Sequence, residues 1–327
     1  MTDADATIII PNYNGMRFLP DLMASLKRQS LGGARIIVVD DASTDDGCAY
    51  LRSEHPTVTV LRNERNLGFA GTCNAGLRAA TTTFVVLLNN DTTVDEDWLA
   101  AGLAAFDAPD IAAVASLVVL AEPPHRIDTA GDVYSVVGAA AKRCHGRPRE
   151  SARDLPREVF SACGASAFYR RERIAQLGCL DERMVSYYED VDMGFRLAWA
   201  GLRCVFEPRS VCYHRLSASY DPRGWNYHFN SARNAEIIWQ TLMPQSIRDE
   251  FADARRAFLA IQAAHKWRLG CLKAHRAGRR AAAEAVDWIA QKRADVAKLA
   301  GDSGVTAEQI AARLERDWWR LHGWGRR

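Results

Sequence analysis

The chain has 327 residues, of which 48% are hydrophobic and 25% charged, an ordinary composition for a soluble protein of one large or two smaller domains. The formal net charge of +2 is too small to indicate a nucleic-acid partner. No apolar run approaches the ~20 residues of a membrane-spanning helix, and the acidic start, Met1 to Asp5, is unlike a signal peptide. The eight cysteines lack zinc-site spacing, so we expect free thiols and a cytoplasmic protein.

Strand and helix patterns alternate over about the first 110 residues. Short apolar runs predict strands at residues 6–10, 34–39, 58–61 and 84–88. Between and after them, apolar residues at helical spacing predict helices at residues 16–29, up to about 53, up to 80, and at 94–106. This alternation predicts an α/β fold with a mostly parallel, doubly wound, Rossmann-like sheet.

Each of these strands ends in polar or glycine-containing residues, namely Asn12-Tyr13-Asn14, Asp40-Asp41, Asn66 to Gly68, and Asn89 to Asp91. Parallel strands place such ends along one edge of the sheet, where α/β proteins bind ligands. Helix caps and turns are the alternative explanation for the acidic residues. No G-x-G-x-x-G or G-x-x-x-x-G-K-[ST] motif follows a strand, which argues against a dinucleotide-binding fold and a P-loop NTPase.

The side chains at these strand ends suit a nucleotide pocket. The ring of Tyr13 can stack on a base, and Asp40 or Asp41 can accept a hydrogen bond from it. Asp91 offers a carboxylate and Asn89 a neutral oxygen on the same face of the chain, which are ligands that Mg²⁺ or Mn²⁺ prefers.

The second half of the chain is less regular. Residues 111–120 predict a strand, and the basic segment 142–157 predicts a mobile loop that covers the acceptor or is partly disordered. A strand of small residues follows at 160–170, in which Gly164 would allow a ligand to approach closely. Short strands are expected at residues 204–208 and 210–214.

An acidic cluster precedes the last of these strands. Glu189 or Asp190 is expected to begin a helix that runs to residue 200, and capping is one explanation for carboxylates at that position. Asp192 and Arg196 have the spacing of an ion pair on one helix face, which we interpret as structural. His214 ends a strand shortly after these carboxylates.

From about residue 227 the chain is expected to be helical to its end. Residues 254–327 contain sixteen Lys and Arg against seven Asp and Glu, interspersed with large apolar residues. We expect a basic helical extension, residues 241–327, that packs on the catalytic domain or on a homodimer partner. The alternative is an amphipathic region that lies on anionic lipid, at the inner face of the cell membrane.

Taken together, these motifs resemble the family 2 inverting glycosyltransferases of the GT-A fold, in the branch of bacterial rhamnosyltransferase-like enzymes. The resemblance covers residues 6–240, with a nucleotide-binding half at 1–115 and an acceptor half at 116–240. It rests on Ile10 to Gly15, Val38 to Asp45, Asn66 to Ala70, Leu88 to Asp91, Tyr188 to Asp192 with Arg196, His214, and Arg233-Asn234.

The resemblance implies a nucleoside-diphosphate sugar as donor and a hydroxyl of a glycan or a lipid-linked molecule as acceptor. Tyr13 resembles the aromatic residue beside the base, Asp41 the acid that reads its edge, and Arg233 the basic residue that faces the leaving diphosphate. The remaining residues assigned to the donor are Pro11, Asn14, Asp40, Asn66, Gly68, Asn89 and Asn90.

The resemblance also implies a metal ion, Mg²⁺ or Mn²⁺, and a general base. Asp91 matches the last acid of the family's DxD motif, and His214 resembles a histidine that in some members contacts the metal. Because Asn89 replaces the first acid, the expected metal site has one carboxylate fewer. Asp190 matches the general base, with Glu189 beside it. Gly164 and Tyr188 are assigned to the acceptor.

Two other functions fit parts of the pattern. A catalytically silent nucleotide-sugar-binding or assembly module would use the basic helical region as its working part. A nucleotidyltransferase shares a related α/β architecture, but its basic glycine-rich loop after the first strand is replaced here by Pro11-Asn12-Tyr13-Asn14-Gly15.

Overall fold

The computed structural model describes residues 4–216 and 224–321 of the chain, so three of the residues in the acidic start and the last six lie outside it. A ten-stranded sheet forms the centre of the molecule, in the order β10-β12-β6-β11-β4-β1-β2-β3, with β5 paired to β12 and β7 to β6. Its strands are β1 (Ala6–Asn12), β2 (Arg35–Asp40), β3 (Thr59–Arg62), β4 (Phe84–Leu88), β5 (Thr92–Val94), β6 (Ile111–Leu120), β7 (Ile127–Thr129), β10 (Glu158–Val159), β11 (Ser166–Arg170) and β12 (Arg203–His214).

The prediction of a mostly parallel α/β sheet is confirmed. Strands β3, β2, β1 and β4 are parallel, as are β6 and β12, whereas β11 runs antiparallel between β4 and β6. The two short strands expected at the end of the sheet are one strand, β12, with an irregular register between Glu207 and Val211. Because residues 92–94 pair with β12 as β5, the following helix, α4 (Trp98–Ala104), begins later than the sequence predicts.

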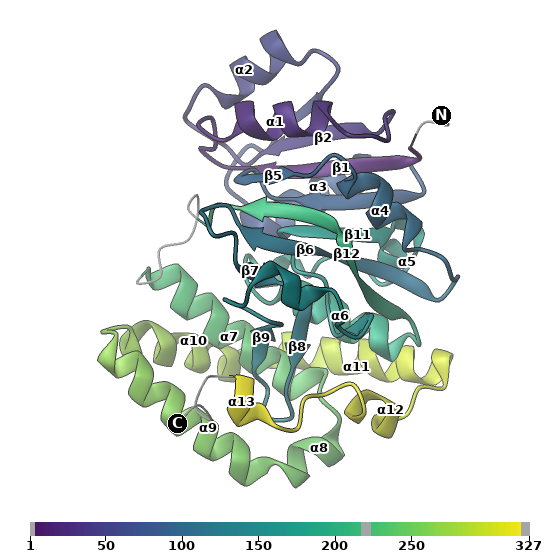
Figure 1. The fold of residues 1–327 in the computed structure, drawn as a ribbon. Coiled ribbons are helices and arrows are strands. Elements are labelled where there is room, and N and C mark those ends of the chain that lie inside the picture. The colour runs from purple at the N-terminus through teal and green to yellow at the C-terminus, as the bar shows by residue number, and fades with distance from the viewer. Residues whose placement is uncertain (1–3, 217–223, 322–327) are drawn as a thin grey trace.

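Helices cover both faces of the sheet, as Figure 1 shows. In β1, the side chains of Ile8 and Ile10 pack on one face and Ile9 on the other, as the alternation of a strand requires. The first face carries α1 (Leu19–Lys27), α2 (Gly47–Glu54) and α4. The second carries α3 (Gly68–Ala79), α5 (Arg171–Gln176) and α6 (Glu189–Trp199), so α6 begins at Glu189 as expected.

The C-terminal helices gather at the end of the molecule opposite α1 and α2 (Figure 1). They are α7 (Trp225–Thr241), α8 (Gln245–Glu250), α9 (Ala252–Arg268), α10 (Leu272–Glu284), α11 (Val286–Ser303), α12 (Ala307–Ala311) and α13 (Trp318–Leu321). A third apolar core joins them to α6 and to a hairpin of β8 (Asp132–Tyr134) and β9 (Ala140–Lys142). The division into domains at residue 240 stays a prediction. The described helices include none that is both long and apolar enough to cross a bilayer.

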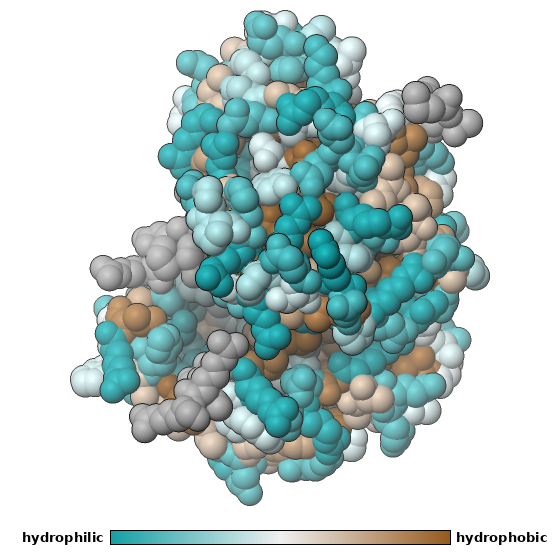
Figure 2. Space-filling model, in the orientation of Figure 1, coloured by the Kyte–Doolittle hydropathy of each residue, from teal (hydrophilic) through white to brown (hydrophobic). Residues whose placement is uncertain are grey.

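The cysteines and the surface agree with the sequence analysis. The eight cysteines all lie within the described residues and none of them forms a disulfide, and five are buried. The face drawn in Figure 2 is largely hydrophilic, with hydrophobic atoms visible in separate patches.

Candidate active site

The carboxyl ends of β1, β2 and β4 meet at one edge of the sheet through their side chains. The Asn12 amide donates to Asp40 Oδ1 at 3.3 Å, and the Asn90 amide donates to Asn12 Oδ1 at 2.8 Å. The second oxygen of Asp40 accepts the Ser43 N–H at 3.1 Å. The sequence therefore brings Asp40 and Asn90 together as predicted, and both side chains cross-link the loops that form this edge.

Asp41 holds the loop that follows β3. Its carboxylate accepts the backbone N–H groups of Leu67 at 2.8 Å and Gly68 at 3.0 Å, and the side-chain amide of Asn63 at 2.8 Å. Contact with a base stays a prediction for Asp41, because its buried oxygens already have these donors. The ring of Tyr13 is 46% exposed, so it is open to a planar ligand.

The neighbours of Tyr13 are fixed by the loop after β2. The Asn14 N–H donates to Ser43 Oγ at 2.9 Å, and Asn14 Oδ1 accepts the Thr44 N–H at 2.8 Å. Asn14 has a φ of 49°, a left-handed conformation that asparagine tolerates better than most residues. Pro11 pairs with Val39 inside the sheet, and Asn66 Oδ1 accepts the Gly68 N–H at 3.1 Å.

A buried histidine links two carboxylates near the end of β4. His214 Nε2 lies 3.3 Å from Asp91 Oδ1, and its Nδ1 lies 3.1 Å from Asp128 Oδ2. Burial disfavours the charged imidazole, but the hydrogen bonds and charges of Asp128 and Asp91 outweigh it and raise the pKa of His214 to about 9. Asp91 and His214, which are 123 residues apart in the sequence, thus meet as the resemblance implies.

Asp128 is a site residue that the sequence analysis missed. Its side chain is fully buried and contacts Lys142 Nζ at 2.7 Å and His145 Nδ1 at 3.4 Å as well as His214. Burial opposes its ionised form, but the hydrogen bonds from both histidines and the charge of Lys142 hold its pKa below the usual range. Its signal in the sequence is weak, because Asp128 stands in a short stretch without a motif.

These contacts change the interpretation of the basic segment that begins at Lys142. Lys142 and His145 bind Asp128, and Arg143 Nε donates to the Ala130 carbonyl at 2.8 Å. The first part of this segment is therefore anchored against β7 and β8. The interpretation of the whole segment as a mobile loop is wrong here, because its cations compensate a buried carboxylate.

Asp91 and His214 fit a divalent cation. His214 donates its Nδ1–H to Asp128 and directs Nε2 toward Asp91, so Nε2 would become the ligand atom once a metal ion displaces its proton, an arrangement typical of metal-binding histidines. Within the described residues, no group of three or more His, Cys, Asp and Glu side chains could hold a metal ion. The protein thus offers two ligands, and a diphosphate and water would have to complete the shell. The partly exposed Asn89 lies beside them, two residues before Asp91.

The acidic pair lies at the amino end of α6. Asp190 accepts the Gly164 N–H at 3.2 Å through Oδ2 and the Val191 N–H at 2.8 Å through Oδ1. Burial raises the pKa of Asp190, although these N–H groups favour its charged form. Glu189 is more deeply buried, and burial followed by the charge of Asp190 raises its pKa well above the usual value. Its buried Oε2 has no hydrogen-bond partner among the residues that the structure describes.

A strained turn presents this pair. Val185, Tyr187 and Tyr188 have φ values of 65°, 71° and 71°, and a left-handed conformation is costly for a β-branched residue such as Val185. The Asn234 amide of α7 donates to the carbonyls of Met184, Ser186 and Tyr187 at 2.9, 3.1 and 2.7 Å and so holds the turn. Tyr188 leads directly into Glu189, so the turn sets the position of the acidic pair.

The loop around Gly68 supports the same turn from the other side. The Ala70 N–H donates to the Val185 carbonyl at 3.0 Å, and a Cβ on Gly68 would lie 2.5 Å from a methyl group of Val185. Gly164 likewise lies against Phe69, whose ring a Cβ at position 164 would approach to 2.9 Å. Both glycines therefore permit close packing between the donor half and the acceptor half.

Arg233 contributes to the turn as well. Its Nη2 donates to the carbonyls of Arg183 and Met184 at 2.9 and 3.1 Å, and its Nε donates to the Asn234 side chain at 3.0 Å. A role for Arg233 beside a diphosphate stays a prediction, because these donors are directed to the backbone of the turn.

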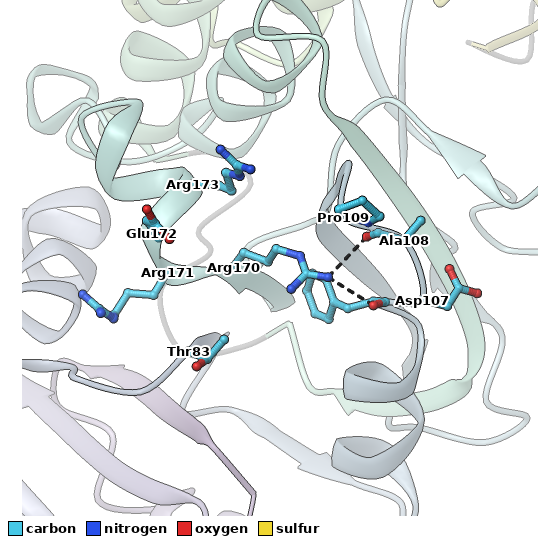
Figure 3. Close-up of a pocket in the computed structure, with 9 residues that line it drawn as sticks. Thr83, Asp107, Ala108, Pro109, Arg170, Arg171, Glu172 and Arg173 are labelled. Atoms are coloured by element: carbon cyan, nitrogen blue, oxygen red, sulfur yellow. Dashed lines mark hydrogen bonds between the residues drawn. The ribbon is translucent and has the colours of Figure 1, made fainter.

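A cavity of 420 Å³ lies at the other end of the sheet, between the residues before β4 and those after β11. Figure 3 shows that the guanidinium of Arg170 in its wall is directed at the Ala108 carbonyl, which lies at 3.2 Å. The same guanidinium donates to the Phe106 carbonyl at 3.1 Å. Because ligands of α/β sheets bind at the carboxyl ends of the parallel strands, we do not assign the donor to this cavity.

Known proteins of similar sequence include glycosyltransferases. A pre-mycofactocin glycosyltransferase of Mycobacterium tuberculosis is 32% identical over 216 residues, which are 64% of this chain and 42% of that protein. A poly-beta-1,6-N-acetyl-D-glucosamine synthase of Staphylococcus aureus is 22% identical over 63% of this chain and 49% of its own length. The chain therefore matches less than half of either relative.

Two solved structures share the fold. GalNAc-T7, solved with UDP, GalNAc and Mn²⁺, has a TM-score of 0.60 at 18% identity and covers 77% of this chain and 50% of its own. The mannosyltransferase PcManGT of Pyrobaculum calidifontis, solved with GDP-Man and Mn²⁺, has a TM-score of 0.54 at 20% identity and covers 99% and 85%. At these identities the likeness concerns the fold, which is the GT-A type.

The family model of glycosyl transferase family 2 matches residues 7–178, which is more than half of the chain. This segment contains the strand-end residues and Asp91, and it ends just before the turn that presents the acidic pair. The chain therefore belongs to glycosyl transferase family 2.

Proposed function

We propose that the chain is an inverting glycosyltransferase that moves a sugar from a nucleoside-diphosphate sugar to a hydroxyl of a glycan or a lipid-linked acceptor. The observation that carries this proposal is that two groups of residues lie at one end of the sheet, where the Asn89 N–H donates to the Ala165 carbonyl at 3.1 Å, next to Gly164, whose N–H donates to Asp190. Asp91 and His214 form a ligand pair at the end of β4, and Asp190 lies at the amino end of α6. Glu189 and Gly164 accompany Asp190 on the acceptor side.

The donor would lie along the edge formed by β1, β2 and β4. Tyr13 would cover the base, and the loops held by Asp40 and Asp41 would shape the pocket around the nucleoside. Asp91 and His214 would hold Mg²⁺ or Mn²⁺, which supplies positive charge where negative charge builds on the leaving diphosphate. Rhamnose is one candidate sugar, and hexoses and N-acetylhexosamines are others.

Asp190 would act as the general base. Its raised pKa suits the task, because a carboxylate is a better proton acceptor when its pKa lies closer to the working pH. It would take the proton of the acceptor hydroxyl while that oxygen attacks the anomeric carbon from the side opposite the leaving group. A single displacement of this kind inverts the anomeric centre without a covalent intermediate.

The test is a donor screen. The protein is incubated with Mn²⁺ or Mg²⁺ and a panel of UDP-, dTDP- and GDP-sugars, and the release of free nucleoside diphosphate is followed. We expect release from one donor that EDTA and Asp91→Ala abolish. Asp95→Ala serves as a matched control, because Asp95 is a nearby acid that pairs with Arg149 outside the site. Release that survives both EDTA and Asp91→Ala would contradict the metal site.

A catalytically silent nucleotide-sugar-binding module is the second candidate. The observation that favours it is that Asp41 and Arg233 already bind groups of the protein itself. A nucleoside diphosphate with Mn²⁺ would then raise the melting temperature, but no donor would be consumed even with acceptor glycans present. A nucleotidyltransferase would instead release pyrophosphate from a nucleoside triphosphate.

We propose that the enzyme works at an anionic membrane surface, through α9 and α10. Residues 254–283 contain eight Lys and Arg and no Asp or Glu. Trp267 at the end of α9 is 71% exposed, and Leu269 beside it is 44% exposed. Exposed aromatic and basic residues together favour the interface of an anionic bilayer, which would bring the active site to a lipid-linked acceptor. Self-association into a homodimer is the alternative use of this surface.

A further inference from the structure

We propose that Lys292 of α11 is a positioning residue for the acidic pair, so that the C-terminal helices complete the active site instead of forming an independent extension. This inference rests on the proposed function for its catalytic meaning. It starts from a lysine that the motifs of the active site do not include. Lys292 is 4% exposed, and a lysine buried to this extent needs partners of opposite charge.

Lys292 bridges the two segments on either side of the acidic pair. Its Nζ lies 3.0 Å from Asp181 Oδ2, before the strained turn, and 2.5 Å from Asp192 Oδ1, in the first turn of α6. The two carboxylates are eleven residues apart, and Glu189 and Asp190 lie between them. One ammonium group thus joins the segment that enters the turn to the helix that leaves it.

Each carboxylate has further partners that fix its place. Asp192 binds Arg196 at 2.6 Å, and Arg196 donates to the carbonyls of Leu177 and Cys179 at 2.6 and 2.7 Å. The pair of Asp192 and Arg196, expected from its spacing, is therefore one part of a larger buried network that also reaches the segment before Asp181.

A second residue of α11 reaches the same acid. The Trp288 indole N–H donates to Asp181 Oδ2 at 2.9 Å, and Trp288 stands one helical turn before Lys292, so both lie on one face of α11. The guanidinium groups of Arg183 and Arg233 lie 5.1 and 5.6 Å from the Trp288 ring. Since Arg233 also binds the carbonyls of the turn, α11 and α7 support that turn together.

The strain in the turn explains why such support is needed. Left-handed residues at 185, 187 and 188 persist only where surrounding contacts hold them, and without the bridge the turn can relax. Asp181 and Asp192 would then be left as buried carboxylates without their shared cation. Relaxation would move Asp190 away from the acceptor hydroxyl, while the donor edge at β1, β2 and β4 would keep its structure.

The test compares Lys292→Met and Lys292→Arg with Ile310→Ala. Ile310 of α12 is fully buried in the same C-terminal core, so its truncation loosens the packing without removing a polar contact to the turn. All variants are measured at a temperature at which circular dichroism shows them folded. Two readouts are taken, namely transfer kinetics and amide hydrogen exchange of residues 181–190.

We expect Lys292→Met to lower kcat by about 10²-fold, because a misplacement of about 1 Å can cost this much, with little change in the KM for the donor. Lys292→Arg should recover most of the wild-type kcat. Ile310→Ala should keep kcat within about threefold of the wild type, although its loss in Tm is similar to that of Lys292→Met. Exchange of residues 181–190 should rise in Lys292→Met and not in Ile310→Ala. If exchange there does not change, or if Ile310→Ala loses as much kcat as Lys292→Met, the positioning role is wrong.

The exchange experiment separates this inference from the proposed function. If exchange at residues 181–190 is faster in Lys292→Met but the wild type consumes no donor, then Lys292 does hold the turn and the transferase proposal is wrong. Unchanged exchange in a protein that does turn over a donor would overturn the positioning role alone.

Discussion

Replacing Asp128 by Asn tests the metal site through a residue that does not itself bind the metal. The carboxylate of Asp128 accepts from Lys142 on both oxygens, at 2.7 and 2.9 Å, and from His214 on Oδ2 at 3.1 Å. An amide has the same shape but only one acceptor oxygen. In Asp128→Asn the neutral amide turns an N–H donor either to Lys142 at the Oδ1 position or to both Lys142 and His214 at the Oδ2 position, so the contacts that orient His214 are weakened.

The magnitude follows from the role of such partners. Loss of the group that orients a metal-binding histidine typically costs 10- to 100-fold in metal affinity, which is about 1.4–2.7 kcal/mol. We expect Mn²⁺ binding in the presence of UDP to weaken by this factor. The pKa of His214 should fall from about 9 toward its usual value, because one of the two carboxylates that raise it is gone.

Isothermal titration with Mn²⁺, at constant UDP and at a temperature where the protein is folded, measures the affinity. Asp110→Asn is the matched control, since it removes one carboxylate that pairs with Arg203 at 2.6 Å far from His214. If Asp128→Asn binds Mn²⁺ as tightly as the wild type, or if the control weakens binding equally, His214 is not a metal ligand held by Asp128.

Three other predictions concern the base, a buried acid and the membrane surface. Asp190→Asn should lower kcat at least about 10²-fold in steady-state assays, while UDP should still raise the Tm of the variant. Normal turnover by Asp190→Asn would show that the base is another group, and Glu189→Gln would be the next variant to assay. Burial, followed by the charge of Asp190, raises the pKa of Asp132 to about 8, so wild-type stability is lost as pH rises from about 4 through 8. As the pH rises over this range, the free energy of unfolding of Asp132→Asn in urea should therefore increase relative to that of the wild type, by up to roughly 5 kcal/mol. A difference between the two free energies that does not vary with pH would refute the raised pKa of Asp132. The membrane surface is tested by replacing three exposed basic residues of α10 by Glu, namely Lys273, Arg276 and Arg280. Flotation with vesicles that contain phosphatidylglycerol should recover the wild type but not this variant, whose donor hydrolysis should be unchanged. Equal recovery of both proteins would exclude this surface as the membrane contact.

Local pattern predicted most strands and helices of the nucleotide-binding half. The strands Phe84–Leu88 and Ile111–Leu120 have the predicted bounds, and the other early strands differ from prediction by two residues at one end or by one residue at each end. Short apolar runs bounded by polar ends carry this information within a few residues of sequence. The start of α6 at Glu189 was also predicted from the sequence, because the carboxylates in its first turn are favoured at the amino end of a helix.

Contacts between distant segments decided the rest. The helix expected from residue 94 starts at Trp98, because residues 92–94 pair with a strand more than 100 residues later. Likewise, Lys142 looked like part of a mobile basic loop, and only its contact with the buried Asp128 shows that it is anchored. No local pattern reveals either contact, since each depends on which surfaces the fold brings together.

The sequence by itself determined the fold class, the edge of the sheet at which the motifs meet and the family, because strand-end motifs and apolar periodicity are local properties. Only the tertiary structure placed Asp128 behind His214, 86 residues away, and Lys292 beneath the acidic pair, 111 residues from Asp181. Both are buried charges whose partners come from distant segments. Their effect depends on low dielectric surroundings and on distances of about 3 Å, which exist only after the chain has packed.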